Sequence, residues 1–283
     1  KVAYVCTCSS EEFKEFVSSQ TNCPCRKNSP KENLTRWKKM LDKKGYKEGK
    51  AVLLFKSNLK DPKPALRDFP LARINEKKHP KKGNKYRVWP LMNLSVSFDD
   101  MEDKMTHIIR AKEHRFNSLR QAMIFKVFKK KAPEALFLGR YKFIDLELSC
   151  SKTKKLIQKK KYSGWEDIRL PFLTALQKRG YQPDTFRKIA EIRGISEVDK
   201  VMSKEDYFKV LDDINREILK NKARKIEFSD KKAKGFVKVS IIMSDGKRKS
   251  GYARGKVKDG EIIHFLGLGY AKLNGKEFWF THK

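Results

Sequence analysis

The chain has 283 residues, enough for two or three domains, and no run of about 18 apolar residues that could span a membrane. It carries 67 Lys+Arg against 34 Asp+Glu, a formal net charge of +33, and glutamate does not keep pace with lysine as it does in lysine-rich thermophile proteins. We therefore expect a polyanionic partner, most commonly a nucleic acid, no membrane partner, and a location in the cytoplasm.

Four of the five cysteines fall in two pairs, Cys6-x-Cys8 and Cys23-x-Cys25. Residues i and i+2 of an extended segment share a face, so each pair offers two thiolates at once. Four thiolates make a closed tetrahedral zinc site. Disulfides or free thiols are the alternative, but disulfides are rare in the reducing interior that the composition indicates. The spacing predicts one structural Zn²⁺ on Cys6, Cys8, Cys23 and Cys25.

The rest of the first 75 residues holds one predicted helix and one predicted strand. Ser29–Leu41 has apolar residues at helical spacing, and Ala51–Phe55 is typical of a buried strand. Two arginines follow, Arg67 and Arg73. Each could form an ion pair inside the fold or contact a bound RNA, and the sequence leaves both interpretations open.

The stretch Leu146–Lys154 is rich in small polar residues and ends in cations. It shows no apolar period, so we expect a loop. Hydroxyls of Ser149 and Ser151, backbone N–H groups and the Lys152 ammonium together suit a polyphosphate. A solvated connector is the alternative. After it, Tyr162–Pro171 predicts a turn leading into a helix.

Helices should follow up to about residue 224. We expect one over Leu170–Gly180 with Leu170, Leu173 and Leu176 facing inward and Gly180 ending it. Pro183 begins another, and Ser203 caps a third with Asp206 three positions on. Lys200–Lys204 also looks like a lysine loop. We set it aside because it lies at a predicted helix start and comes after the part of the chain that ends in the Leu146–Lys154 stretch.

From about residue 225 the apolar period changes to two, which indicates strands. Turns are expected at Asp245-Gly246 and at Asn274-Gly275, and Asn-Gly between strands is a strong hairpin pattern. About 60 residues suffice for one small β-barrel.

Several stretches together resemble the archaeal-type glutamyl-tRNA synthetases, which are class I aminoacyl-tRNA synthetases. The loop and turn match the family pattern L-S-x-S-K followed by G-W-[DE]-D-x-R-L-P, and Pro64–Ile74 is similar to P-x-x-R-D-x-x-x-x-R-I. Asn28–Leu34, Trp89–Asp100 and Thr106–His114 also resemble the family, which carries C-x-C and C-P-C in its acceptor-binding insertion.

The resemblance implies a multidomain fold of α/β, all-α and β-barrel parts. Residues 1–75 would be the zinc-containing acceptor-binding insertion, and residues 76–153 the second half of a Rossmann-type catalytic domain with its lysine loop. Residues 154–224 would be the helical stem-contact domain. Residues 225–283 would form a shortened anticodon-type barrel.

The resemblance also implies residue roles. Ser149, Ser151 and Lys152 would bind ATP with Mg²⁺, with Ser151 and Lys152 catalytic. Met92 and Arg110 would bind L-glutamate, since the arginine fork suits a carboxylate; an ion pair of Arg110 with Asp103 or Glu113 is the alternative. The expected tRNA contacts are Arg67, Arg73, Trp165 and Arg169.

The family's H-x-G-H motif does not occur in this sequence. The chain begins at Lys1, in a predicted strand, so we expect an upstream or separate amino-terminal fragment that carries the motif. We predict a glutamate–tRNA ligase for tRNA(Glu) that is inactive as this chain alone. A non-catalytic tRNA-binding remnant is one alternative. A glutaminyl-tRNA synthetase is another, against which Met92-Asn93 and the cysteine pairs argue.

Overall fold

The structure is a computed structural model that describes residues 2–283; Lys1 lies outside the described residues. The chain forms two compact units, Lys1–Gly139 and Arg140–Lys283, and each is described by itself. In the described part, no helix has the length and apolarity needed to cross a bilayer.

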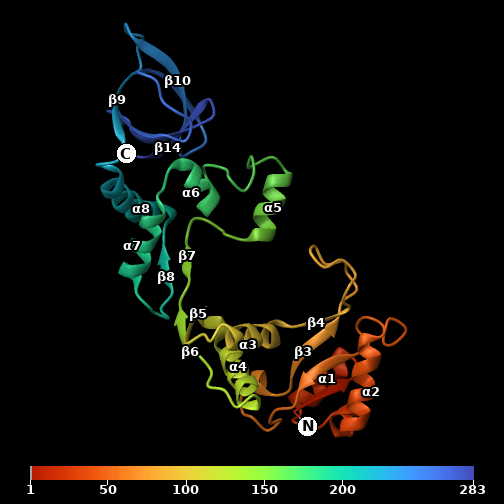
Figure 1. Ribbon diagram of the computed structural model, residues 1–283. Helices are drawn as coiled ribbons and strands as arrows, with labels where there is room; N and C mark the ends of the chain where they lie inside the picture. The colour runs from red at the N-terminus through yellow and green to blue at the C-terminus, as the bar shows by residue number, and fades with distance from the viewer. Residues whose placement is uncertain (1) are drawn as a thin grey trace. The chain divides into compact units, whose positions relative to one another are not determined.

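The first unit begins with an antiparallel four-stranded sheet in the order β1-β2-β3-β4 (Figure 1). Its strands are β1 (Ala3–Cys6), β2 (Val52–Phe55), β3 (Phe69–Ile74) and β4 (Val88–Pro90). The helical segments beside it are α1 (Ser10–Ser18), η1 (Pro24–Lys27), α2 (Pro30–Leu41) and η2 (Pro64–Leu66). Ser29 caps α2. The predicted helix and the predicted strand, here α2 and β2, are both confirmed. Met40 of α2 is buried against Val5 and Ile74, which fixes the helix on the sheet.

The unit continues with a strand–helix–strand element. Its parts are α3 (Met92–Glu102), β5 (His107–Ala111), η3 (Lys112–His114), α4 (Arg115–Val127) and β6 (Glu134–Leu138). Strands β5 and β6 pair in parallel, from His107 opposite Glu134 to Ala111 opposite Leu138. A parallel pair joined through a helix is the repeating element of nucleotide-binding α/β folds. Phe69 of β3 and Phe125 of α4 share one core cluster, so this element packs on the four-stranded sheet.

The second unit opens with four helices and two short strands, β7 and β8, which pair in parallel. These elements are β7 (Tyr141–Phe143), α5 (Cys150–Gln158), α6 (Leu173–Arg179), α7 (Pro183–Arg193), β8 (Lys200–Met202) and α8 (Lys204–Leu219). Gly180 ends α6 with φ of 100°, a conformation that glycine adopts without strain. Pro183 begins α7, and the Ser203 hydroxyl accepts the Asp206 N–H at the start of α8. These three predictions are confirmed.

Two predictions about this region are wrong. Leu173 does not face inward: it is the first residue of α6 and is 68% exposed, while Leu170 and Leu176 are buried. The stretch Leu146–Lys154 is not a loop throughout, because α5 begins at Cys150. The partly buried apolar residues of α5, Leu156 and Ile157, lie beyond that stretch and therefore gave it no period.

The last strands close into a six-stranded barrel in the order β10-β11-β9-β12-β13-β14 (Figure 1). They are β9 (Arg224–Ser229), β10 (Phe236–Ile242), β11 (Arg248–Arg254), β12 (Ile262–Leu266), β13 (Gly269–Asn274) and β14 (Glu277–His282). The predicted barrel is confirmed, as is the turn at Gly246. The last hairpin turns one residue later than expected: Asn274 pairs with Glu277, so the two-residue loop is Gly275-Lys276.

Buried polar groups join the helices of the second unit to its barrel. Arg179 of α6 donates to the main-chain oxygen of Thr281 at 2.7 Å. Asn215 of α8 lies 2.9 Å from Nε2 of His282, whose side chain is almost fully enclosed. Because buried polar groups are costly unless paired, this network holds the barrel in a defined position on the helices.

Candidate functional site

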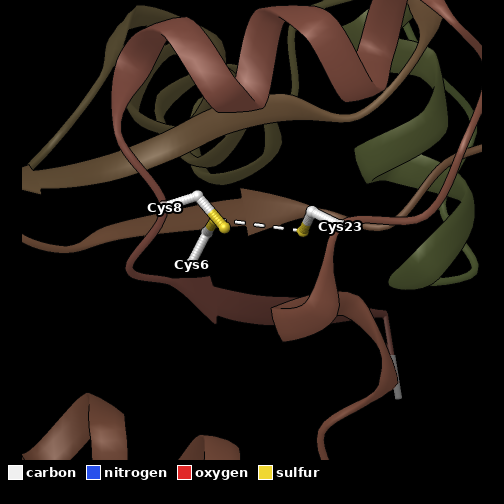
Figure 2. A group of neighbouring side chains, drawn as sticks. All are labelled: Cys6, Cys8 and Cys23. Carbon is white, nitrogen blue, oxygen red and sulfur yellow. Dashed lines mark hydrogen bonds between the residues drawn. The ribbon is translucent and has the colours of Figure 1, made fainter.

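Three of the four predicted zinc ligands, Cys6, Cys8 and Cys23, meet at the end of β1, and Cys25 lies next to Cys8 but outside this group of three. Figure 2 shows Cys6, Cys8 and Cys23 directed at a common point, and their sulfur atoms all lie within 4.8 Å of one another. The Cys6–Cys23 and Cys8–Cys25 sulfur separations are both 3.9 Å. That distance is close to the edge of a zinc–thiolate tetrahedron, about 3.8 Å for Zn–S bonds of about 2.3 Å. It is far longer than a disulfide bond, and the five cysteines are free thiols.

The surroundings lower the pKa of two of the four thiols, Cys23 and Cys25, and raise the pKa of the other two, Cys6 and Cys8. The hydrogen bond between Cys6 and Cys23 lowers the pKa of Cys23 and raises that of Cys6. Burial raises the pKa of Cys25, but hydrogen bonds from Thr7 and Arg36 outweigh burial, and the net pKa is lowered. The Arg36 guanidinium lies 3.3 Å from the Cys25 sulfur. A cation at this distance offsets part of the negative charge of a four-thiolate site, so the donor set fits Zn²⁺.

The two arginines of Pro64–Ile74 have different environments. Arg67 is 5% exposed and donates to the main-chain oxygens of Asp61 and Val17, both at 2.9 Å. Its guanidinium therefore ties the end of α1 to the loop that follows β2 and offers little to a bound RNA. Arg73 is exposed and lines a cavity of about 440 Å³ together with Cys6, Cys8 and Lys14. Arg73 is thus the arginine that an RNA beside the thiol cluster could contact.

Met92 and Arg110 lie together, as a shared substrate site requires. They line a small cavity of about 200 Å³ between α3, β5 and α4. Met92 is half exposed at the first turn of α3. The other lining residues are Asn93, Val96, Ala111, His114, Asn117 and Gln121. One cation in a largely apolar cavity is suited to a small anionic ligand.

Arg110 is held by partners that the sequence reading did not identify. Its guanidinium donates to Ser118 at 3.1 Å and to Gln121 at 2.6 Å, and it lies 3.9 Å from the Asp100 carboxylate. Gln121 in turn donates to Asp100. Burial lowers the pKa of Arg110, and Asp100 opposes this shift. A signal was present in the sequence: Ser118 and Gln121 are three residues apart on the helix that follows Arg110.

The predicted ATP-binding residues lie at the start of α5, in the second unit. Ser149 is the N-cap, and its hydroxyl accepts the Lys152 N–H at 3.4 Å. Ser151 and Lys152 lie in the first turn, where free N–H groups and the helix dipole favour an anion. The Lys152 ammonium pairs with Glu147, and both side chains are about two-thirds exposed. Ser203 caps α8 in the same way, so our reason for setting Lys200–Lys204 aside, that it lies at a helix start, does not separate the two segments.

Trp165 and Arg169 lie in the turns before α6. Arg169 donates to the Asp167 carboxylate through Nε at 2.8 Å and Nη2 at 2.7 Å. Burial raises the pKa of Asp167, but the bonds from Arg169 and Ser163 outweigh it and hold the pKa well below its usual value. Trp165 is 41% exposed and packs against Phe172. The motif thus forms a turn fixed by Asp167, with Trp165 on its surface.

The class of protein follows from comparison with known families. The family described as "tRNA synthetases class I (E and Q), catalytic domain" matches residues 1–220, which include the thiol cluster, the Arg110 cavity and the start of α5. The chain therefore belongs to this family of class I tRNA synthetases. The resemblance read from the sequence is confirmed.

Individual relatives narrow the comparison. The glutamate–tRNA ligase of Methanothermobacter thermautotrophicus is 40% identical over 227 residues, 80% of this chain and 40% of that protein. That of Methanocaldococcus jannaschii is 41% identical over 226 residues, again 80% and 40%. A glutamate tRNA ligase structure from Elizabethkingia meningosepticum has a TM-score of 0.42 and 17% identity over 79% of this chain and 51% of that one. The chain spans about 40% of the length of the curated relatives it matches.

Proposed function

We propose that this chain is part of a glutamate–tRNA ligase, which activates L-glutamate with ATP and Mg²⁺ and transfers it to tRNA(Glu). The family match carries the proposal, because it spans the Arg110 cavity and the Lys152 helix start together. The archaeal relatives that resemble the chain are glutamate–tRNA ligases.

Arg110 would bind the substrate carboxylate. Ser118, Gln121 and Asp100 fix its guanidinium at the wall of the cavity, so little side-chain freedom is lost when an anion arrives. Met92 forms part of the wall next to it. An arginine held in this way presents two parallel N–H donors, which match the two oxygens of a carboxylate.

Ser149, Ser151 and Lys152 would bind the phosphates of ATP. Adenylate formation expels pyrophosphate, so negative charge grows on the leaving group. A lysine ammonium with N–H groups at a helix start stabilises that charge more than it stabilises bound ATP. Lys152 would have to leave Glu147 to do so. This is a small change, because exposed ion pairs contribute only about 0–1 kcal/mol.

The thiol cluster would hold one structural Zn²⁺ in an acceptor-binding module. Such an ion supplies cross-links rather than chemistry, because a closed four-thiolate site leaves no open position. The cations around it, Arg73 and Lys14 in particular, would face the tRNA acceptor end. Trp165 and Arg169 would contact tRNA elsewhere.

The reaction also needs donors that this chain does not carry as an H-x-G-H motif. We propose that a segment with this motif, joined upstream or supplied as a separate chain, completes the ATP site. It would pair with the outer edge of β5: in the described residues β5 pairs with β6 alone, and Ile109 is 58% exposed. Parallel strands are normally covered on both faces, so this edge and face call for a partner.

The test measures ATP–pyrophosphate exchange with tRNA(Glu) present. The chain is assayed alone and joined to the amino-terminal part of a similar archaeal enzyme. We expect no exchange from the chain alone, and exchange with glutamate but not glutamine from the joined protein. Arg110→Lys should raise the KM for glutamate, because lysine lacks the fork. Exchange by the chain alone would overturn the proposal that another segment must complete the ATP site. A joined protein that binds tRNA without exchange would favour the non-catalytic alternative.

A further inference from the structure

The loop between β3 and β4 is the most concentrated basic segment of the first unit. Residues 77–85 read Lys-Lys-His-Pro-Lys-Lys-Gly-Asn-Lys, with five lysines and no acidic residue. All five lysines are exposed, and none of their ammonium groups pairs with a carboxylate within residues 2–283. Such a run of lysines is usually only solvated, but here the structure gives it a defined shape.

The loop is folded around His79. The main chain of His79 exchanges two hydrogen bonds with the main chain of Gly83, at 3.0 and 2.8 Å. Its ring Nδ1 accepts the N–H groups of both Lys81 and Lys82 at 3.1 Å. The two lysines are thereby held on one tight turn, although their charges repel each other.

The base of the loop is aromatic and anchored. The rings of His79 and Trp89 stack with centroids 4.6 Å apart, and Tyr86 meets Trp89 edge-on at 6.0 Å. Arg87 donates to the main-chain oxygens of Met40 at 3.1 Å and Tyr46 at 2.7 Å. This frame holds Tyr86 half exposed, with the Lys85 ammonium 5.4 Å from its ring centre.

We propose that the loop formed by residues 77–86 binds a single-stranded segment of RNA. Lysines along the turn would contact successive phosphates, and the free face of Tyr86 would stack on a base. Exposed aromatic rings beside a line of cations are what single-stranded nucleic acid requires, because every base has a face that can stack. A duplex keeps its bases stacked internally and could use only the lysines. This inference rests on the proposed tRNA partner and assigns that partner a contact surface.

The test uses the full chain and fluorescence anisotropy over a range of salt concentrations. The probes are a short labelled single-stranded RNA, the same RNA annealed to its complement, and tRNA(Glu). One variant combines Lys81→Gln, Lys82→Gln and Lys85→Gln. Its matched control is Lys129→Gln, Lys130→Gln and Lys131→Gln, which removes the same charge from another exposed run of the same unit.

We expect the loop variant to reduce the slope of log K against log salt by about 2 for the single strand, at about 0.7 for each lost phosphate contact. The control variant should leave the slope near the wild-type value. Equal losses from both variants would mean that charge acts without a site, and would overturn the proposal.

Tyr86 separates stacking from charge. Tyr86→Ala should weaken single-strand binding by about 5- to 150-fold without altering the salt slope, whereas Tyr86→Phe should bind like the wild type. Duplex binding should change little in either variant. Unchanged single-strand binding by Tyr86→Ala would refute the proposal that a base stacks on Tyr86. If the wild-type chain itself fails to bind tRNA(Glu), the proposed function fails instead, so the two failures are distinguishable.

Discussion

The thiol cluster and the start of α5 were both identified from the spacing of a few residues, but they differ in how complete they are. Cys6 and Cys23 are at most 2% exposed, and the cluster's sulfur atoms meet inside one unit. Lys152 is 63% exposed at its side chain, and its described partner is Glu147 rather than any part of a pocket. The Arg110 cavity, which would serve the same reaction, belongs to the other unit.

The difference shows what local spacing can specify. The four cysteines of the cluster all come from one module, so folding that module would complete a site that they form. Lys152 would act on a substrate held jointly with other segments, so its own surroundings fix little beyond a helix start. Experiments on the two sites should therefore fail in different ways: changes in the cluster should unfold the module, and changes at α5 should alter rate.

The largest effect is expected from the thiol cluster. Cys23→Ser should lose the bound metal and unfold the module around it, because zinc binding by such sites contributes on the order of 10–16 kcal/mol to folding. Cys150→Ser is the matched control, since that thiol is exposed and outside the cluster. Elemental analysis and thermal unfolding under reducing conditions measure both. If the wild-type protein purified under reducing conditions contains no zinc, the four cysteines do not form a metal site.

Lys152→Ala should leave the fold intact and lower the rate. In the joined enzyme kcat should fall about 10²- to 10³-fold, because a group that stabilises leaving-group charge is lost. Affinity for tRNA should change little. Lys154→Ala, two positions along α5, is the control and should retain most activity. If Lys152→Ala is as active as the wild type, the start of α5 only connects two segments and Lys152 does not bind ATP. Lys154 and Lys155 would then be the next residues to test.

The same distinction between local and shared structure explains which predictions from sequence succeeded. The helix over Ser29–Leu41, the cap at Ser203 and the stop at Gly180 each depend on a few neighbouring residues, and the structure has them as expected. The cysteine spacing is equally local and brings three of the four thiols together, while the zinc ion stays a prediction. The burial of Arg67 depends on Val17, 50 residues away in sequence, which no local pattern contains. The partners of Arg110 lie only 8 to 11 residues from it, but spacing alone does not show that their side chains turn toward it. The last hairpin shows a smaller limit: the pattern found the turn, but pairing of Asn274 with Glu277 moved it by one residue.

The buried ring of His282, between α8 and the barrel of the second unit, allows a prediction about pH. Burial lowers the pKa of His282 to about 4 from an ordinary 6.5. The folded state thus keeps this ring neutral while the unfolded state takes up a proton. The contribution of this ring to stability should be greatest above about pH 6.5, fall as the pH drops toward 4, and level off below it. The total loss from this group is about 3 kcal/mol.

His282→Gln removes this titration and can still accept a hydrogen bond from Asn215. Urea unfolding of wild type and variant between pH 4 and 6.5 isolates the effect, because carboxylates titrate alike in both. We expect the wild type to lose more stability than the variant over this range. Identical slopes of unfolding free energy against pH would mean that the contact between Asn215 and His282 tolerates a charged ring. The barrel would then be held less firmly on the helices than the buried polar network indicates.

The smallest effect should come from Ser149, and it distinguishes a cap from an ATP ligand. Its hydroxyl accepts the Lys152 N–H at 3.4 Å, while Ser203 accepts the Asp206 N–H at 3.0 Å. Loss of an N-cap usually costs about 0.5–2 kcal/mol, so Ser149→Ala should lie at the low end and Ser203→Ala nearer the middle. Ser149→Asp should restore stability, since aspartate caps well and its charge suits the helix dipole. In the joined enzyme the same carboxylate would repel the phosphates of ATP and raise its KM. Chemical denaturation and pyrophosphate exchange measured on the same three variants test this. Full activity in Ser149→Asp would leave Ser149 with a capping role and no contact with ATP.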